Sequence, residues 1–236
     1  MNKYKLETLK YKVKELNLLV PIDVLVVGAT GVGKSSTINS LFGQDITKVG
    51  IGVDPETKII SSHKMHNYLR FHDSAGLGDG READLEHSKN ITSKLLEYVS
   101  IKEQKFGFID LVLVILDGGS RDFGTTFKLL ENVILKSIEP ERVMVVINQA
   151  DMAMKANHWD FKKNKPTKQL FDYLDEKVVS VEARIKEATG LTISKPIYFS
   201  AYHKYNINAV MDYIIEHLPK QRRDINWGKI NGLLFK

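Results

Sequence analysis

The sequence contains a glycine-rich loop whose residue types and spacing could bind the phosphates of a nucleotide. Gly28 to Ser35 matches the pattern Gly-x-x-x-x-Gly-Lys-Ser/Thr at every fixed position. Glycines let the backbone turn its N–H groups toward a phosphate chain, and a following helix adds positive potential at its N-terminus. In such a loop Lys34 reaches the β- and γ-phosphates, and the Ser35 hydroxyl ligates Mg²⁺. The residues predicted to contact the nucleotide here are Gly28, Thr30, Gly31, Val32, Gly33, Lys34, Ser35 and Ser36.

The surroundings of this loop in the sequence support phosphate binding. The loop directly follows the aliphatic run Val24–Val27 and directly precedes a stretch with Ile38 and Leu41 on one helical side. Strand, loop and helix in this order are the arrangement that the motif requires. A glycine-rich turn with an incidental lysine is the alternative, and this context disfavours it.

A second motif could complete the phosphate and metal site. Asp73-Ser-Ala-Gly76 follows the run Tyr68–His72, which we expect to be a strand. A carboxylate at this strand end can hold the Mg²⁺ shell, usually through water, and the N–H of Gly76 can bond a γ-phosphate without side-chain obstruction. By itself Asp-x-x-Gly is also the sequence of an ordinary Asx turn. Its place at a strand end, after a phosphate loop, favours the metal role.

A third motif could read the base of the nucleotide. Asn148-Gln-Ala-Asp151 follows the apolar run Val143–Ile147. The carboxylate of Asp151 can accept two hydrogen bonds from guanine, whereas adenine offers neither donor and would leave a buried charge unpaired. Ser200-Ala201 follow another apolar run, and a backbone N–H there can bond guanine O6. The predicted base-binding residues are Asn148, Gln149, Asp151, Ser200 and Ala201.

Alternating strands and helices must position these motifs. The expected strands are four unbroken aliphatic runs and a less apolar pair nearer an edge: Val24–Val27, Leu111–Leu116, Val143–Ile147, Ile197–Phe199, Ile59–Met65 and Tyr68–His72. Unbroken apolar runs are typical of central parallel strands, which are covered on both faces. Apolar residues recur at helical spacing over 127–138, 170–185 and 210–218. This alternation predicts an open, mostly parallel α/β sheet, in which ligands bind at the carboxyl ends of the strands.

The composition excludes several classes of chemistry. The 236 residues are 43% hydrophobic and 27% charged, as in ordinary globular domains. The absence of cysteine excludes disulfides, thiolate-bound zinc, iron–sulfur clusters and cysteine nucleophiles, and favours a reducing compartment. The net charge of +5 fits a nucleic-acid or anionic-lipid partner without requiring either. The longest aliphatic run, Leu111–Leu116, is far shorter than the roughly 20 residues of a membrane span.

We expect one domain with two short extensions. The division is an N-terminal amphipathic helix in residues 1–20, the main domain in residues 21–219 and a short basic tail in residues 220–236. The helix could dock on a membrane or a partner. Packing onto the domain is the favoured interpretation, because Glu7 and Glu15 lie among its lysines. The predicted location is the cytoplasm, with peripheral attachment at a membrane as an option.

Together these motifs resemble those of GTPases of the translation-factor class. The order of the four motifs is similar to that of the Era-like bacterial GTPases, and the stretch from Gly28 to Phe42 also resembles septins and chloroplast import receptors. The resemblance runs from about Asp23 to Leu218. It implies a three-layer P-loop fold, with a six-stranded, mostly parallel sheet that has one antiparallel edge strand. It also implies a Mg²⁺-dependent GTP/GDP switch whose loops order around the γ-phosphate.

The resemblance also implies roles for individual residues. The threonine that ligates Mg²⁺ in the GTP state matches Thr57, with Thr47 as a weaker candidate. The metal ligands are then Ser35, Thr57 and Asp73, and the residues that act in hydrolysis are Lys34, Thr57 and Gly76.

Three positions depart from the pattern of these relatives. Gln149 stands where the guanine motif usually has lysine, and its flat stem should preserve guanine selectivity. Leu77 stands where some GTPases place the glutamine that orients the attacking water, so hydrolysis by the isolated chain should be slow. Gly31 stands where potassium-dependent relatives have asparagine, which argues against potassium activation. Several polar residues could position the water instead, although a solvated loop residue or a local ion pair is favoured for each: His72, Asp79, Arg81, Glu82 and Arg121.

Several functions and partners remain open at this point. The leading interpretation is a slow GTP-hydrolysing switch, and the alternative is an adaptor that binds GTP with little hydrolysis. The candidate partners are a second copy bound through the nucleotide face, which could supply an arginine, and a ribosome or membrane surface. The run Lys162–Lys168 could contact RNA but is more often a solvated loop, and we expect no dedicated nucleic-acid-binding domain. An ATP-dependent kinase is disfavoured by Asp151.

Overall fold

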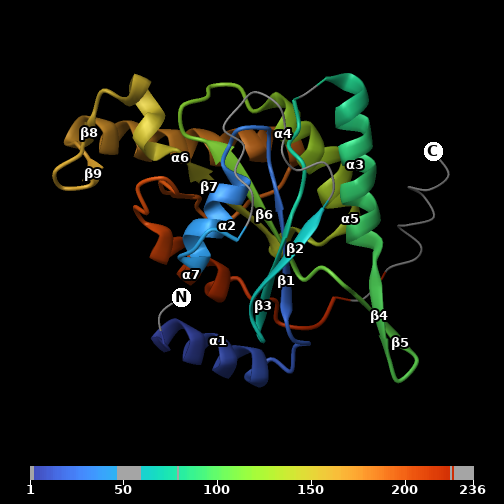
Figure 1. The fold of residues 1–236 in the computed structure, drawn as a ribbon. Coiled ribbons are helices and arrows are strands. Elements are labelled where there is room, and N and C mark those ends of the chain that lie inside the picture. The colour runs from blue at the N-terminus through green and yellow to red at the C-terminus, as the bar shows by residue number, and fades with distance from the viewer. Residues whose placement is uncertain (1–2, 47–59, 79, 224, 226–236) are drawn as a thin grey trace.

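The protein folds into three layers around a central sheet (Figure 1). The computed structural model describes residues 3–46, 60–78, 80–223 and 225. Within these residues six strands form the sheet in the order β10-β7-β6-β1-β3-β2, and β2 alone runs antiparallel to its neighbour. The strands are β1 (Ile22–Val27), β2 (Ser61–His66), β3 (Leu69–Asp73), β6 (Leu111–Asp117), β7 (Val143–Asn148) and β10 (Ile197–Tyr198). The predicted fold class is confirmed, with the antiparallel strand at the edge.

Helices cover both faces of the sheet. They are α1 (Lys3–Glu15), α2 (Lys34–Phe42), α3 (Arg81–Leu96), α4 (Gly124–Leu129), α5 (Leu135–Ser137), α6 (Lys168–Thr189) and α7 (Ile207–Glu216). The single helix expected over 127–138 is divided, because a π-helical turn at Leu130–Ile134 separates α4 from α5. Among the described helices, none combines the length and the apolar character of a membrane span.

Alternate residues of the central strands feed two separate cores. Val24 and Val26 of β1 pack in a cluster with side chains from α1, α2 and α7. Leu25 and Val27 pack in a second cluster, with side chains from α3, α4 and α6. Because successive strand residues point to opposite faces, an unbroken apolar strand needs cover on both sides. This arrangement leaves the carboxyl ends of the parallel strands free to carry loops.

Helix α1 lies against the domain rather than apart from it. Leu9 and Val13 are buried in the same cluster as the α7 side chains. The Lys5 amine donates to the carbonyl oxygen of Asn208 at 2.8 Å and pairs with the Asp212 carboxylate. The apolar stripe of this helix is therefore occupied by intramolecular packing.

Other segments were not anticipated from the sequence. Helix α3 was not recognised, and neither were the hairpins β4 (Tyr98–Ile101) with β5 (Gln104–Gly107) and β8 (Trp159–Asp160) with β9 (Lys165–Pro166). The lysine run expected to be a loop contributes the turn of the second hairpin. At the other end of the chain, Arg223 of the expected tail is only 2% exposed, and its guanidinium donates to the Leu95 and Ser137 carbonyl oxygens at 2.6 and 3.1 Å.

Candidate nucleotide-binding site

The glycine-rich loop lies at the carboxyl end of β1 and leads directly into α2. Gly31 and Gly33 adopt left-handed backbone angles, with φ values of 79° and 86°. A side chain at Gly33 would also collide with the amide of Asn148. Glycine is therefore required at position 33 both by its backbone conformation and by the close approach of the third motif. The loop turns at the N-terminus of α2, where the first backbone N–H groups of a helix favour an anion.

Lys34 and Ser35 begin α2, and their side chains point in different directions, Lys34 toward the glycine-rich loop and Ser35 toward the end of β3. The Lys34 amine is buried and donates to the carbonyl oxygens of Gly28 and Ala29, at 3.3 and 3.0 Å. The Ser35 hydroxyl donates to Oδ2 of Asp73 at 2.6 Å. The predicted pair of metal-binding side chains is thus in direct contact, although Ser35 and Asp73 lie on different elements.

The Asp73 carboxylate has the properties of a cation ligand. Its second oxygen, Oδ1, is buried and has no hydrogen-bond partner in the described part of the chain. Burial raises the pKa of Asp73, and the Ser35 hydrogen bond and the Lys34 charge oppose this rise. A buried carboxylate oxygen without a donor is costly unless a cation or water satisfies it. A hydroxyl and a carboxylate are also the hard oxygen ligands that Mg²⁺ prefers, so the residues present fit this metal.

The Gly76–Leu77 segment lies directly on the glycine-rich loop. Ala29 and Leu77 form a parallel β-bridge, and the Thr30 N–H donates to the Leu77 carbonyl oxygen at 2.7 Å. A Cβ atom added at Gly76 would lie 2.7 Å from the Thr30 nitrogen, so glycine is required by this close approach. The sequence predicted that Gly76 would face the phosphates, and the structure brings it against the loop itself.

Asn148 joins the phosphate loop to the loop after β10. Its amide nitrogen donates to the Val32 carbonyl oxygen at 2.8 Å, and its amide oxygen accepts from the Ala201 N–H at 2.9 Å. The neighbouring Gln149 donates from Nε2 to the Gly31 carbonyl oxygen at 2.7 Å. Three motifs that are far apart in the sequence are therefore held together by side-chain hydrogen bonds.

A cavity of about 720 Å³ opens beside this junction. Its lining includes Gly33 and Ser36 from the phosphate loop and Asp151, Ser200 and Ala201 from the predicted base-binding motifs. The Asp151 side chain is 9% exposed, and its Oδ1 has no hydrogen-bond partner among the described residues. A nearly enclosed carboxylate at the wall of a cavity is suited to a ligand that brings N–H donors.

Comparison with known protein families shows to which family the chain belongs. The model of the 50S ribosome-binding GTPase family matches residues 23–178. The chain belongs to this GTPase family. A Physcomitrium patens protein, translocase of chloroplast 125, is 38% identical to this GTPase over 78 residues, which are 32% of the chain and 7% of that protein. The chain thus spans a small part of that relative.

Solved structures show the same fold as this GTPase. Toc33 from Arabidopsis thaliana in complex with GDP and Mg²⁺ matches with a TM-score of 0.64 at 18% identity, over 95% of this chain and 94% of that one. Era in complex with MgGDPNP and a 16S ribosomal RNA segment matches with a TM-score of 0.53 at 21% identity, over 84% of this chain and 56% of that one. Both identities are low, so these matches concern the fold alone.

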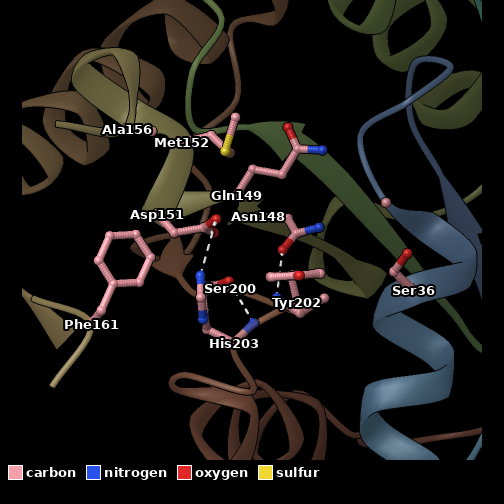
Figure 2. A pocket seen from close by; sticks show the side chains of 12 residues that line it. Ser36, Asn148, Gln149, Asp151, Met152, Ala156, Phe161, Ser200, Tyr202 and His203 are labelled. Atoms are coloured by element: carbon pink, nitrogen blue, oxygen red, sulfur yellow. Dashed lines mark hydrogen bonds and ion pairs between the residues drawn. The ribbon is translucent and has the colours of Figure 1, made fainter. Parts of the chain in front are cut away.

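An aromatic group in this GTPase, which the sequence analysis missed, lines the same cavity. Figure 2 shows Phe161 and His203 on the side of the cavity where Asp151 lies. The His203 ring stacks on Trp159 with centroids 5.2 Å apart, and its Nε2 lies 3.8 Å from Oδ2 of Asp151. Phe161 is 71% exposed on the β8–β9 turn. In the sequence, Phe161 directly precedes the lysine run 162–168 and His203 closely follows Ser200-Ala201. Only the lysines of this run were considered in the sequence analysis.

Other predicted residues of this GTPase lie away from the cavity or outside the described residues. Thr57, Thr47 and Asp79 lie outside the described residues. His72 is fully buried; its ring is hydrogen-bonded to Asp23 at 2.6 Å and to Ser62 at 2.8 Å. His72 therefore makes a local polar contact, which the sequence analysis favoured over a role in positioning water. Arg121 is exposed, and its carbonyl oxygen accepts from Arg184 at 3.0 Å.

Proposed function

We propose that this protein binds GTP and GDP together with Mg²⁺ and hydrolyses GTP slowly, as a molecular switch. The observation that carries the proposal is the nearly enclosed Asp151 carboxylate, which lines a cavity that also reaches Gly33 of the phosphate loop. Guanine brings two N–H donors to such a carboxylate. Adenine would leave the charge unpaired, so the site favours guanine.

The phosphates would bind at the loop that precedes α2. The backbone N–H groups from Gly31 to Ser35 lie at a helix N-terminus, and the Lys34 amine is already held at the same loop. Ser35 and Asp73 would hold Mg²⁺, with Thr57 as the further ligand that the family resemblance implies. Bound Mg²⁺ would offset the negative charge of the phosphate chain. The neighbours Toc33 and Era were both solved with Mg²⁺ and a guanine nucleotide, which supports this ligand set.

Slow hydrolysis is proposed from the position after Gly76. Leu77 has no group that could orient water, and it is buried. Dimerization is important for the GTPase activity of the chloroplast components atToc33 and psToc159. We infer that a second copy, or another partner such as a ribosome or a membrane surface, completes the site of this protein.

Competition for a bound fluorescent GDP tests the nucleotide assignment. With Mg²⁺ present, GTP and GDP should displace it, whereas ATP should need at least about 100-fold higher concentration. Equal displacement by ATP would end the guanine assignment. Phosphate release, measured at increasing protein concentration and with liposomes or ribosomes, tests the switch. A rate that stays at background in every condition would favour the adaptor with little hydrolysis.

A further inference from the structure

The phosphate loop of this protein is closed from one side by its own chain. Besides the Thr30 to Leu77 hydrogen bond at 2.7 Å, the Leu77 N–H lies 3.4 Å from the Gly28 carbonyl oxygen. The bridge between Ala29 and Leu77 therefore extends the β1–β3 pairing beyond the ends of both strands. Thr30 was predicted to contact the nucleotide, but its N–H is used within the protein.

In the proposed binding mode this contact lies where the third phosphate must enter. In the proposed binding mode the γ-phosphate lies between the loop and the N–H of Gly76. An oxygen that bonds two N–H groups keeps about 2.7–3.2 Å from each nitrogen, so the loop and Gly76 must stand apart to admit it. In this structure a Cβ atom added at Gly76 would lie 2.5 Å from Thr30 Cα and 2.7 Å from the Thr30 nitrogen, so no phosphate oxygen fits between Gly76 and Thr30. The N–H groups nearer to the start of α2 do not take part in the bridge, so a diphosphate can still bind there.

The side chain of Leu77 anchors the closed segment. Leu77 is 3% exposed and belongs to the core cluster that contains Val27, Ile91 and Leu95. The next residue is held as well, because the Gly78 N–H donates to the Asp84 carboxylate at 2.7 Å, near the start of α3. Opening the bridge must therefore withdraw an apolar side chain from the core or strain the segment that carries it.

We propose that Leu77 is a specificity-determining residue that makes the free protein select a guanosine diphosphate over a triphosphate. Its burial holds Gly76 and Leu77 on the phosphate loop, and GTP binds only to the fraction of molecules in which the Ala29–Leu77 bridge is open. A ligand that needs a minor conformation has its apparent affinity reduced by the population of that conformation. This inference rests on the proposed function, because it concerns the third phosphate at the same site.

The test compares the dissociation constants of GDP and of the non-hydrolysable analogue GMPPNP, measured with Mg²⁺. Wild type should bind GDP at least about tenfold more tightly than GMPPNP. Leu77→Ala should reduce this ratio by about tenfold, chiefly through tighter GMPPNP binding, because the smaller side chain anchors the bridge less well. Leu95→Ala is the matched control, since it removes the same atoms from the same cluster away from the bridge, and its ratio should equal that of wild type.

A second variant guards against a folding failure. Asp84→Ala removes the hydrogen bond to Gly78 at an exposed position and should shift the ratio in the same direction by a smaller factor. If Leu77→Ala does not fold, the Asp84→Ala result decides. An unchanged ratio in both variants, an equal shift in Leu95→Ala, or equal affinities in wild type would overturn the inference while guanine binding stands. Failure of wild type to bind either nucleotide would instead overturn the proposed function.

Discussion

Asp151→Asn should reverse the base preference of this protein. The Asp151 carboxylate is nearly enclosed, and one of its oxygens has no partner among the described residues, so it can accept two hydrogen bonds from guanine. Hydrogen bonds to a charged group contribute about 1.5–3 kcal/mol each. In the variant the amide oxygen can accept only one of them and the amide NH2 faces the second guanine donor. The lost hydrogen bond and the unpaired donor together cost about 3–6 kcal/mol, or roughly two to four orders of magnitude in the dissociation constant of GDP. An asparagine amide can donate to the 2-oxygen of xanthine, so xanthosine diphosphate should bind the variant better than GDP.

Displacement of a fluorescent nucleotide measures this change. Titrations of the variant with GDP and with xanthosine diphosphate give the two dissociation constants on one scale. Asp172→Asn is the control, because it removes the same charge from an exposed position on α6 that pairs with Lys168. The control should keep the affinities of wild type. If Asp151→Asn binds GDP within threefold of the control, Asp151 does not read the base and the cavity has another ligand.

Three further changes have expected outcomes. Lys34→Ala should weaken GDP binding by about 10- to 100-fold, because a charged donor to the phosphates is lost, and unchanged affinity in the same titration would refute the phosphate loop. Phe161→Ala should weaken GDP and inosine diphosphate by one common factor of about 2–10, since a ring against the base does not read its edge; a factor that differs between the two bases would contradict this. Burial raises the pKa of Asp110 from 3.8 to about 7, with Asp23 and Arg223 among the charges that face it. The folded state therefore keeps a proton that the unfolded chain loses, so the free energy of unfolding should fall by up to about 4 kcal/mol as pH rises from about 4 to 7. Asp110→Asn should remove this fall in urea titrations at pH 5 and 8, and a parallel fall in both proteins would count against it.

The sequence could predict that the motifs of the site lie near one another. Gly33, Asn148 and Ala201 each follow or begin an element with a strong local pattern, and parallel strands end at the same edge of a sheet. Their neighbourhood was therefore predictable, although their hydrogen bonds were not. The aromatic lining was missed because Phe161 and His203 lie on a short hairpin and a turn, which have no periodic pattern.

The sequence by itself determined the strands of the sheet, most of its covering helices and the chemistry of the loops between them. Strand and helix periods are local properties, and a phosphate loop or a guanine-binding carboxylate depends on residue types at short spacing. Only the tertiary structure shows that the side chain of Leu77 points into the core. It also shows that the Gly76–Leu77 segment pairs with Ala29 and Thr30. It also decided that Arg223, in an apparently solvated tail, is buried against α3 and α5. Such contacts join residues far apart in the chain, and their energy depends on packing that no local pattern records.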